Sequence, residues 1–265
     1  MHEEYGAMLF AALRDGRPVK PLAGRDPALT IDDAYAVSLD FLARRRAQGE
    51  RVIGKKIGVT SKAVQDMLGV HQPDFGFLTD RMRVQGDIDV DAHKLIAPRA
   101  EAEVAFLLKD DLRGPGVTPE DVFSATAYIV PCFEIVDSRI ADWNISIIDT
   151  VADNASCGVF ILGEERLDPT ALQLPDMHVA VAKNGEALSE GLGSAVQGDP
   201  AMAVAWLANT LGAYGVTLDR GDIILSGSLV PLAPATRGDR FEMTLSDRDP
   251  AKGGAIVGSC TANFV

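Results

Sequence analysis

Three glutamates occupy positions where the neighbouring residues indicate buried strands. Glu101 and Glu103 lie in the run 98–108, and side chains two positions apart in a strand share one face, which here continues into apolar residues. Glu134 lies inside the apolar run 129–137, where an isolated carboxylate is costly to bury. Carboxylate oxygens gathered from two strands favour a hard divalent cation over zinc. The spacing therefore indicates a metal site formed by Glu101, Glu103 and Glu134.

The same spacing has a plainer interpretation, which the sequence leaves open. Glu101 and Glu103 would lie on a solvated face, and Glu134 would form an ion pair with an arginine such as Arg139. Carboxylates side by side on a strand repel each other at close range unless a cation lies between them. The choice between the two interpretations therefore depends on whether this face is buried.

Two further segments carry groups that are able to transfer protons. Lys55 and Lys56 are adjacent in a strand expected over residues 51–58, so their side chains point to opposite faces and at most one faces a cleft. A desolvated lysine can act as an acid or a base. Asp74 follows Pro73 on what we expect to be a constrained loop. The pattern by itself favours a lysine facing water and an aspartate in a turn.

Small polar residues gather in two other segments. The tract 149–158, which includes Ser156, could orient a substrate carboxylate or a water, and it could equally be a turn with local hydrogen bonds. Ser226 and Ser228 could line a pocket, but they lack the G-x-S-x-G frame of a nucleophilic serine. The histidines show no ligand spacing, so we assign them no role.

The elements that must position these groups are mainly strands behind a helical start. A capping box at Thr30 and Asp33 opens a helix that ends near Gly49, and Asn184-Gly185 predicts a hairpin turn. Without βαβ alternation, the order indicates one α+β domain over residues 1–265, with a helical segment at 1–50 and a strand-rich core at 51–265. Other helices are expected near 7–13, over 60–67 and from Thr118 and Asp199, and strands over 51–58, 95–108, 127–137, 159–162, 178–183, 222–225, 241–245 and 255–265.

Composition excludes several classes of function. The chain has 265 residues, with 38 acidic against 25 basic side chains, and its net charge of −13 disfavours nucleic acid and anionic membranes as partners. Three cysteines without CxxC spacing form neither a disulfide framework nor a zinc ribbon. No apolar run reaches the length of a membrane span, and the acidic start does not read as a signal peptide. We therefore expect a cytoplasmic protein.

These segments together resemble the 2-keto-4-pentenoate hydratase / 4-oxalocrotonate decarboxylase family, a branch of the fumarylacetoacetate hydrolase superfamily. The resemblance extends from Thr30 to Val265 and rests on several separated motifs that match in order. The motifs that carry it are KKIGVTS at 55–61, PRAEAE at 98–103, EIVDSR at 134–139 and DTVADNAS at 149–156.

The resemblance implies a mixed β-roll fold, homo-oligomers and a bound Mg²⁺ or Mn²⁺. Carried over by motif, the metal ligands are Glu101, Glu103 and Glu134, and the active-site lysine is Lys56 rather than Lys55. The implied activity is that of a hydro-lyase in the meta-cleavage catabolism of aromatic compounds. Water adds to 2-hydroxypenta-2,4-dienoate to give 4-hydroxy-2-oxopentanoate.

The resemblance also suggests how the residues share this reaction. The metal would chelate the substrate carboxylate and C2 oxygen and stabilise the charge that develops there. Lys56 would transfer a proton during ketonisation, and Asp74 would position or deprotonate the water that adds at C4. Ser156 and Arg139 would bind the substrate.

Three alternatives to the hydratase remain at this point. A 4-oxalocrotonate decarboxylase would use the same metal, although the decarboxylases of the family lack the aspartate found here at Asp74. A hydrolase of carbon–carbon bonds in β-diketones would need a His–Glu pair, and no histidine lies near the motifs in the sequence. A catalytically silent partner subunit would not need the three glutamates and Lys56. Association with other enzymes of the pathway is a further expectation.

Overall fold

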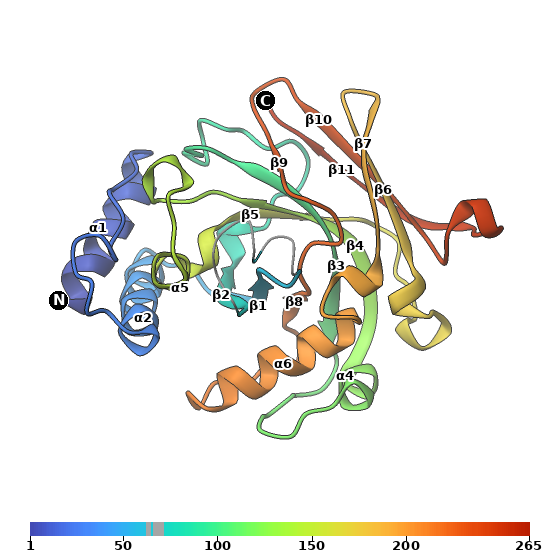
Figure 1. Cartoon of the computed structure of the whole chain (residues 1–265), viewed down its shortest axis with the longest axis horizontal. Helices are drawn as coiled ribbons and strands as arrows, with labels where there is room; N and C mark the ends of the chain where they lie inside the picture. Colours follow the sequence, from blue (N-terminus) through green and yellow to red (C-terminus); the bar gives the residue numbers. More distant parts are fainter. Residues whose placement is uncertain (62–64, 66–71) are drawn as a thin grey trace.

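The helical start of the chain matches the capping signals of the sequence. The computed structural model describes residues 1–61, 65 and 72–265, so the helix expected over 60–67 lies largely outside the described residues. Helix α1 (His2–Asp15) ends at Gly16, whose φ of 61° is left-handed, and α2 (Ile31–Ala47) begins with the capping box of Thr30 and Asp33. The two helices pack against each other beside β2 (Asp74–Thr79), the edge strand of the larger of two sheets (Figure 1).

Two sheets form the centre of the molecule. The larger has seven strands in the order β2-β1-β8-β3-β4-β5, with β9 paired to β3, and the smaller has the order β11-β10-β6-β7. The predicted turn at Asn184-Gly185 joins β6 to β7, with φ of 55° and 82°. The strands are β1 (Val52–Gly58), β2 (Asp74–Thr79), β3 (Arg99–Leu108), β4 (Thr126–Val136), β5 (Cys157–Leu162), β6 (His178–Lys183), β7 (Glu186–Leu192), β8 (Ile223–Leu225), β9 (Ala233–Pro234), β10 (Arg240–Ser246) and β11 (Ile256–Asn263).

The main hydrophobic core lies between the sheets and under the helices. Phe133 of β4 and Phe241 of β10 bring the sheets together, with ring centroids 6.2 Å apart. Helices α4 (Pro119–Ala125) and α6 (Pro200–Gly212) start at the predicted caps, Thr118 and Asp199, and lie along one side of the larger sheet (Figure 1). The mixture of antiparallel sheets, one parallel pair between β1 and β8, and separate helices confirms the predicted α+β class.

The structure corrects three local predictions. Asp74 is the first residue of β2, paired with Gly58 of β1, and does not lie on a loop. Lys55 and Lys56 are both buried, because β1 is covered on both faces. The sequence had led us to expect that at most one of them would face the interior or a cleft. The tract 149–158 begins in a helix that the sequence analysis missed, α5 (Ile147–Ala152), which the Ser146–Asp149 capping box opens and which packs on α2.

Lys55 is held by acids at the start of β8. Its Nζ donates to Asp222 Oδ2, and Asp219 Oδ2 lies 3.7 Å away. Asp222 Oδ2 also accepts the backbone N–H of Asp219 at 2.8 Å. This ion pair ties β1 to the turn before β8, and it has no contact with the glutamates. Lys55 therefore has a structural partner of its own.

We expect Asp222→Leu to destabilise the protein by about 3–5 kcal/mol, because it leaves the buried Lys55 ammonium without its partner. The double variant Lys55→Met/Asp222→Leu should regain most of that loss, since no charge is then buried. Urea unfolding measures both. Equal losses in the single and double variants would show that the ion pair is not the cause.

Candidate active site

The three predicted glutamates meet at one point of the larger sheet. Glu101 on β3 is paired directly with Glu134 on β4, and Glu103 lies on the same face two residues along. Each side chain offers an oxygen within 4.8 Å of the others, and all three residues are buried. The structure therefore places the glutamates together in the interior, and the solvated-face interpretation is wrong.

Several of these carboxylate oxygens have no hydrogen-bond partner among the described residues. Glu103 Oε2 accepts the backbone N–H of Gly227 at 2.9 Å, while Glu103 Oε1 and Glu134 Oε2 are buried without a partner, and Glu134 Oε1 has only an ammonium group at 3.3 Å. Buried carboxylate oxygens are normally paired, so these oxygens indicate a further electropositive partner. An all-oxygen donor set of this kind fits Mg²⁺, Mn²⁺ or Ca²⁺.

The electrostatics of the cluster lead to the same conclusion. Burial, together with repulsion from Glu134, raises the pKa of Glu101 to about 8. Burial also raises the pKa of Glu103 well above its usual range, with Glu134 and Glu101 adding to the effect, and raises that of Glu134 despite the nearby Lys56. Three ionised carboxylates are therefore stable together only next to positive charge.

Lys56 supplies part of that charge. Its side chain comes from β1 and is 2% exposed, and Nζ lies 3.3 Å from Glu134 Oε1. Burial opposes the ammonium form, but the charges of Glu134, Asp74 and Glu101 outweigh burial and raise the pKa of Lys56 above its usual value. Glu134 thus pairs with Lys56, and the expected alternative of a pair with Arg139 is wrong.

Asp74 lies beside Lys56 because of a glycine. Gly58 is the β1 residue paired with Asp74, and a Cβ at that position would overlap the Asp74 carboxylate and lie 2.9 Å from Lys56 Nζ. Asp74 Oδ1 is buried and has no hydrogen-bond partner among the residues that the structure describes. Gly58 was not among the predicted site residues, although a glycine inside a strand is a known sign of close approach.

A pocket opens where these groups meet. Ser156 Oγ is buried there without a partner, as Asp74 Oδ1 is. Most of the remaining wall is apolar, and Trp143 stacks on Arg99 at 4.3 Å and donates to the carbonyl of Ala97. The described lining consists of Lys56, Gly58, Val59, Asp74, Glu101, Val136, Trp143, Ile145, Thr150, Ala155, Ser156 and Leu232.

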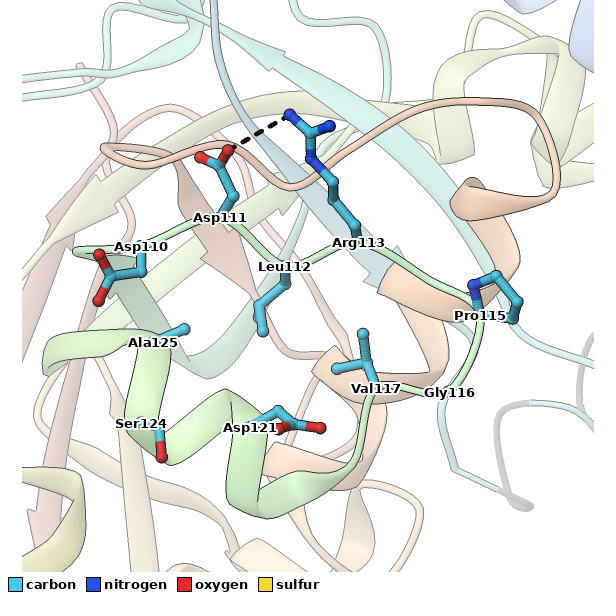
Figure 2. Close-up of a pocket in the computed structure, with 10 residues that line it drawn as sticks. All are labelled: Asp110, Asp111, Leu112, Arg113, Pro115, Gly116, Val117, Asp121, Ser124 and Ala125. Carbon is cyan, nitrogen blue, oxygen red and sulfur yellow. Dashed lines mark hydrogen bonds and ion pairs between the residues drawn. The ribbon is translucent and has the colours of Figure 1, made fainter.

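The size of a cavity does not identify the site in this protein. A hollow of about 390 Å³ lies beside α4, lined among others by Asp111, Arg113 and Val117 (Figure 2). Its acids are exposed or cap α4, and it contains none of the predicted site residues. The pocket beside the glutamates measures only about 30 Å³, yet the buried and unsatisfied Asp74 Oδ1 and Ser156 Oγ belong to its lining residues.

Arg139 does not line the pocket. Its guanidinium donates to Asp153 Oδ1 at 2.6 Å and to the carbonyls of Asp137, Asp153 and Cys157, and the side chain is 1% exposed. These bonds use most of its donors within the protein. Arg139 therefore supports the backbone behind Ser156, which differs from the substrate contact that the sequence analysis expected.

Comparison with known proteins agrees with this geometry. Residues 55–264 match the family described as fumarylacetoacetate (FAA) hydrolase C-terminal. The chain is 56% identical over 264 residues to a 2-hydroxyhexa-2,4-dienoate hydratase of Comamonas testosteroni, covering 99% of this chain and 97% of that protein. It is also 56% identical over 214 residues to a 2-hydroxypent-2,4-dienoate hydratase of Pseudomonas putida, covering 80% of this chain and 96% of that protein.

A solved structure shares the whole fold. The 4-oxalocrotonate decarboxylase from Pseudomonas putida G7, complexed with magnesium and adipate, superposes with a TM-score of 0.89 at 32% identity, covering 100% of this chain and 98% of that one. The predicted mixed-sheet fold of the superfamily is thereby confirmed. In the described part of the chain, no helix has both the length and the apolar character needed to span a membrane. The chain belongs to the fumarylacetoacetate hydrolase family, in the branch that contains the 2-hydroxydienoate hydratases and the 4-oxalocrotonate decarboxylases.

Proposed function

We propose that the chain is a single catalytic domain that adds water to 2-hydroxypenta-2,4-dienoate and releases 4-hydroxy-2-oxopentanoate, in the meta-cleavage breakdown of aromatic compounds. The observation that carries the proposal is a pocket lined by Lys56, Asp74 and Glu101, in which Glu101 belongs to the cluster of three buried glutamates. The hydratases at 56% identity support the same reaction.

We infer that Glu101, Glu103 and Glu134 hold Mg²⁺ or Mn²⁺. Such a cation, once bound, supplies positive charge beside the carboxylate and C2 oxygen of the substrate, where negative charge accumulates as the reaction proceeds. The solved relatives bound to magnesium and to calcium support a divalent ion of this kind. Gly227 N–H donates to Glu103 Oε2, which leaves Oε1 as the oxygen available to a cation.

Lys56 is suited to move the proton of the first step. In ketonisation the proton leaves the C2 hydroxyl, and a proton arrives at C5, which gives a 2-oxo-3-enoate with an electrophilic C4. Lys56 is buried next to Glu134 and lines the pocket, so its Nζ can exchange a proton with substrate where bulk water is excluded. Ser156 Oγ, the buried hydroxyl without a partner, would hold the substrate carboxylate.

Asp74 is suited to the second step. Its free Oδ1 can accept the proton of a water that adds at C4, and C3 takes up a proton in turn. The acid and Lys56 lie on paired strands across Gly58, so the two proton-transfer groups keep a fixed separation. This arrangement favours hydration, which needs a water-activating group besides the metal.

The decarboxylase is the second candidate, because the solved relative at 32% identity has that activity. Its substrate carries a second carboxylate at the far end. Among the lining residues that the structure describes, Lys56 is the only cation, and most of the others are apolar. A distal carboxylate would therefore be buried without a partner, which favours the monoacid substrate of a hydratase.

We also propose that the protein works in the cytoplasm as a homo-oligomer, in association with other enzymes of the pathway. Leu188 and Leu192 on the edge strand β7 and Ile256 on the opposite edge strand β11 are 43%, 42% and 67% exposed, which supports contact with further copies. Light scattering of the purified protein measures the oligomer directly.

Mg²⁺ is expected to stabilise the protein more at pH 8 than at pH 6. Because the pKa of Glu101 is raised to about 8, a cation must displace a proton at pH 6, which weakens its apparent affinity. The stability of the metal-free protein changes with pH in the opposite direction. The folded-state pKa exceeds the ordinary value of 4.5, so stability falls as the pH rises from 4.5 to 8. Thermal melts with and without Mg²⁺ measure both effects.

Glu134→Gln should remove most of the stabilisation by Mg²⁺, because it replaces one carboxylate ligand by a neutral amide. The surface variant Glu165→Gln is the matched control and should keep the wild-type shift. A Glu134→Gln protein that Mg²⁺ stabilises as well as wild type would overturn the ligand assignment.

Asp74→Asn should lower the rate of hydration by roughly 10²-fold or more while ketonisation continues, because the amide cannot accept the proton of the water. Loss of dienol absorbance reports ketonisation, and NMR of 4-hydroxy-2-oxopentanoate reports hydration. The surface variant Asp168→Asn should retain both rates. Hydration by Asp74→Asn at the wild-type rate would exclude the proposed role.

Substrates with and without a second carboxylate test the pocket wall. We expect kcat/KM for 2-hydroxyhexa-2,4-dienoate to lie within about tenfold of the pentadienoate value, because an added methyl beside an apolar wall should change the transition-state free energy by about 1 kcal/mol, the low end of the range for one methylene. 2-Oxo-3-hexenedioate should react at least 100-fold less well and release no carbon dioxide. Rapid release of bicarbonate from that substrate would favour the decarboxylase.

A further inference from the structure

The turn that carries Ser156 has an unusual backbone. Asn154, Ala155 and Ser156 have successive φ values of 54°, 51° and 53°, and none of them is a glycine. Residues with a side chain rarely adopt this left-handed conformation, and they keep it only where surrounding contacts enforce it. The result of the turn is that Ser156 Oγ lies in the pocket, buried and without a partner.

The side chain of Asn154 fastens this turn to strand β2. Its Oδ1 accepts the backbone N–H of Phe77 at 2.7 Å, and its Nδ2 donates to the carbonyl of Phe77 at 2.9 Å. Because β2 is the edge of the larger sheet, the amide takes both bonds that a further strand would have made. Gly76 permits the contact, since a Cβ there would lie 2.5 Å from the carbonyl oxygen of Asn154.

The same strand carries the other proposed catalytic group. β2 begins at Asp74, three residues before the Phe77 that Asn154 holds, and Asp74 and Ser156 line one pocket. Arg139 fixes the turn from the other side through the carbonyls of Asp153 and Cys157. Asn154 thus links the turn that carries Ser156 to strand β2, which carries Asp74.

We propose that Asn154 is a positioning residue. Its amide holds the turn so that the Ser156 hydroxyl lies in the same pocket as Asp74, and it thereby governs binding of the substrate carboxylate. This inference rests on the proposed function of the pocket. The competing explanation is that the amide only closes the edge of the sheet. In that case its loss would lower stability without changing how the substrate binds.

Asn209 provides a matched control for this distinction. Its amide makes the same pair of bonds to one residue, Val117, with Oδ1 accepting at 2.9 Å and Nδ2 donating at 2.9 Å. Val117 lines the hollow beside α4 and lies outside the proposed pocket (Figure 2). Asn→Asp at either position keeps the acceptor and replaces the donor by an oxygen that faces a carbonyl.

Asn154→Asp and Asn209→Asp should both lower the melting temperature, and only Asn154→Asp should raise KM for the dienoate, by about tenfold or more. Should Asn154→Asp fail to fold, Asn154→Gly serves instead, because glycine tolerates the positive φ while the amide is lost. Wild-type KM in a folded Asn154 variant would overturn the proposal, as would an equal rise in KM in Asn209→Asp.

A double-mutant cycle shows whether Asn154 acts through Ser156. Ser156→Ala alone should raise KM, and adding Asn154→Asp should raise it little further, since the hydroxyl to be positioned is already absent. Full additivity would contradict the proposal. Calorimetry of 2-oxopentanoate binding separates the positioning role of Asn154 from the proposed hydratase function, because this acid cannot take up water at C4. If wild type binds this acid more tightly than the Asn154 variant yet hydrates no dienoate, the positioning role stands and the proposed function fails.

Discussion

The repulsion among three buried carboxylates is the constraint on which the rest of this structure depends. Glu101, Glu103 and Glu134 bring ligand oxygens within 4.8 Å of one another in the interior, and the ammonium of Lys56 lies 3.3 Å from Glu134. Such a cluster is stable in ionised form only with additional positive charge, and it lies in a chain whose net charge is −13. A divalent cation resolves the repulsion and provides the charge that an anionic substrate needs. The overall acidity thus belongs to the surface, and the pocket can attract an anion.

The fold supplies the groups of this site from four strands of the larger sheet. β3 and β4 contribute the glutamates in direct register, β1 contributes Lys56, and β2 contributes Asp74. The turn after β8 holds Glu103 through the N–H of Gly227, whose φ of 104° and close approach to Thr60 require a glycine. Because the groups stand on paired strands, their separations are fixed by the sheet and do not depend on the conformation of a long loop.

The sequence predicted those parts of the site that follow from the period of a strand. Alternation placed Glu101 and Glu103 on one face, and the cap and turn signals located most helices and the β6–β7 hairpin. Pairing across strands and burial are long-range properties, so the sequence could not show that both Lys55 and Lys56 are buried, or that Asp74 begins a strand. Arg139 is a similar case, since its partner Asp153 was hidden in a tract that reads as a turn. The left-handed φ values of Ala155 and Ser156 have no local signal, because neighbouring contacts enforce them against the intrinsic preference of the backbone.

The most direct test of this account is anomalous diffraction from crystals of the protein grown with Mn²⁺. The account predicts one strong manganese peak in the larger sheet, with oxygens of Glu101, Glu103 and Glu134 on the order of 2 Å from the ion. The ammonium of Lys56 should remain beside Glu134, outside the coordination sphere. A manganese peak at other acids, or none at saturating Mn²⁺ with the three carboxylates still together and unsatisfied, would contradict it.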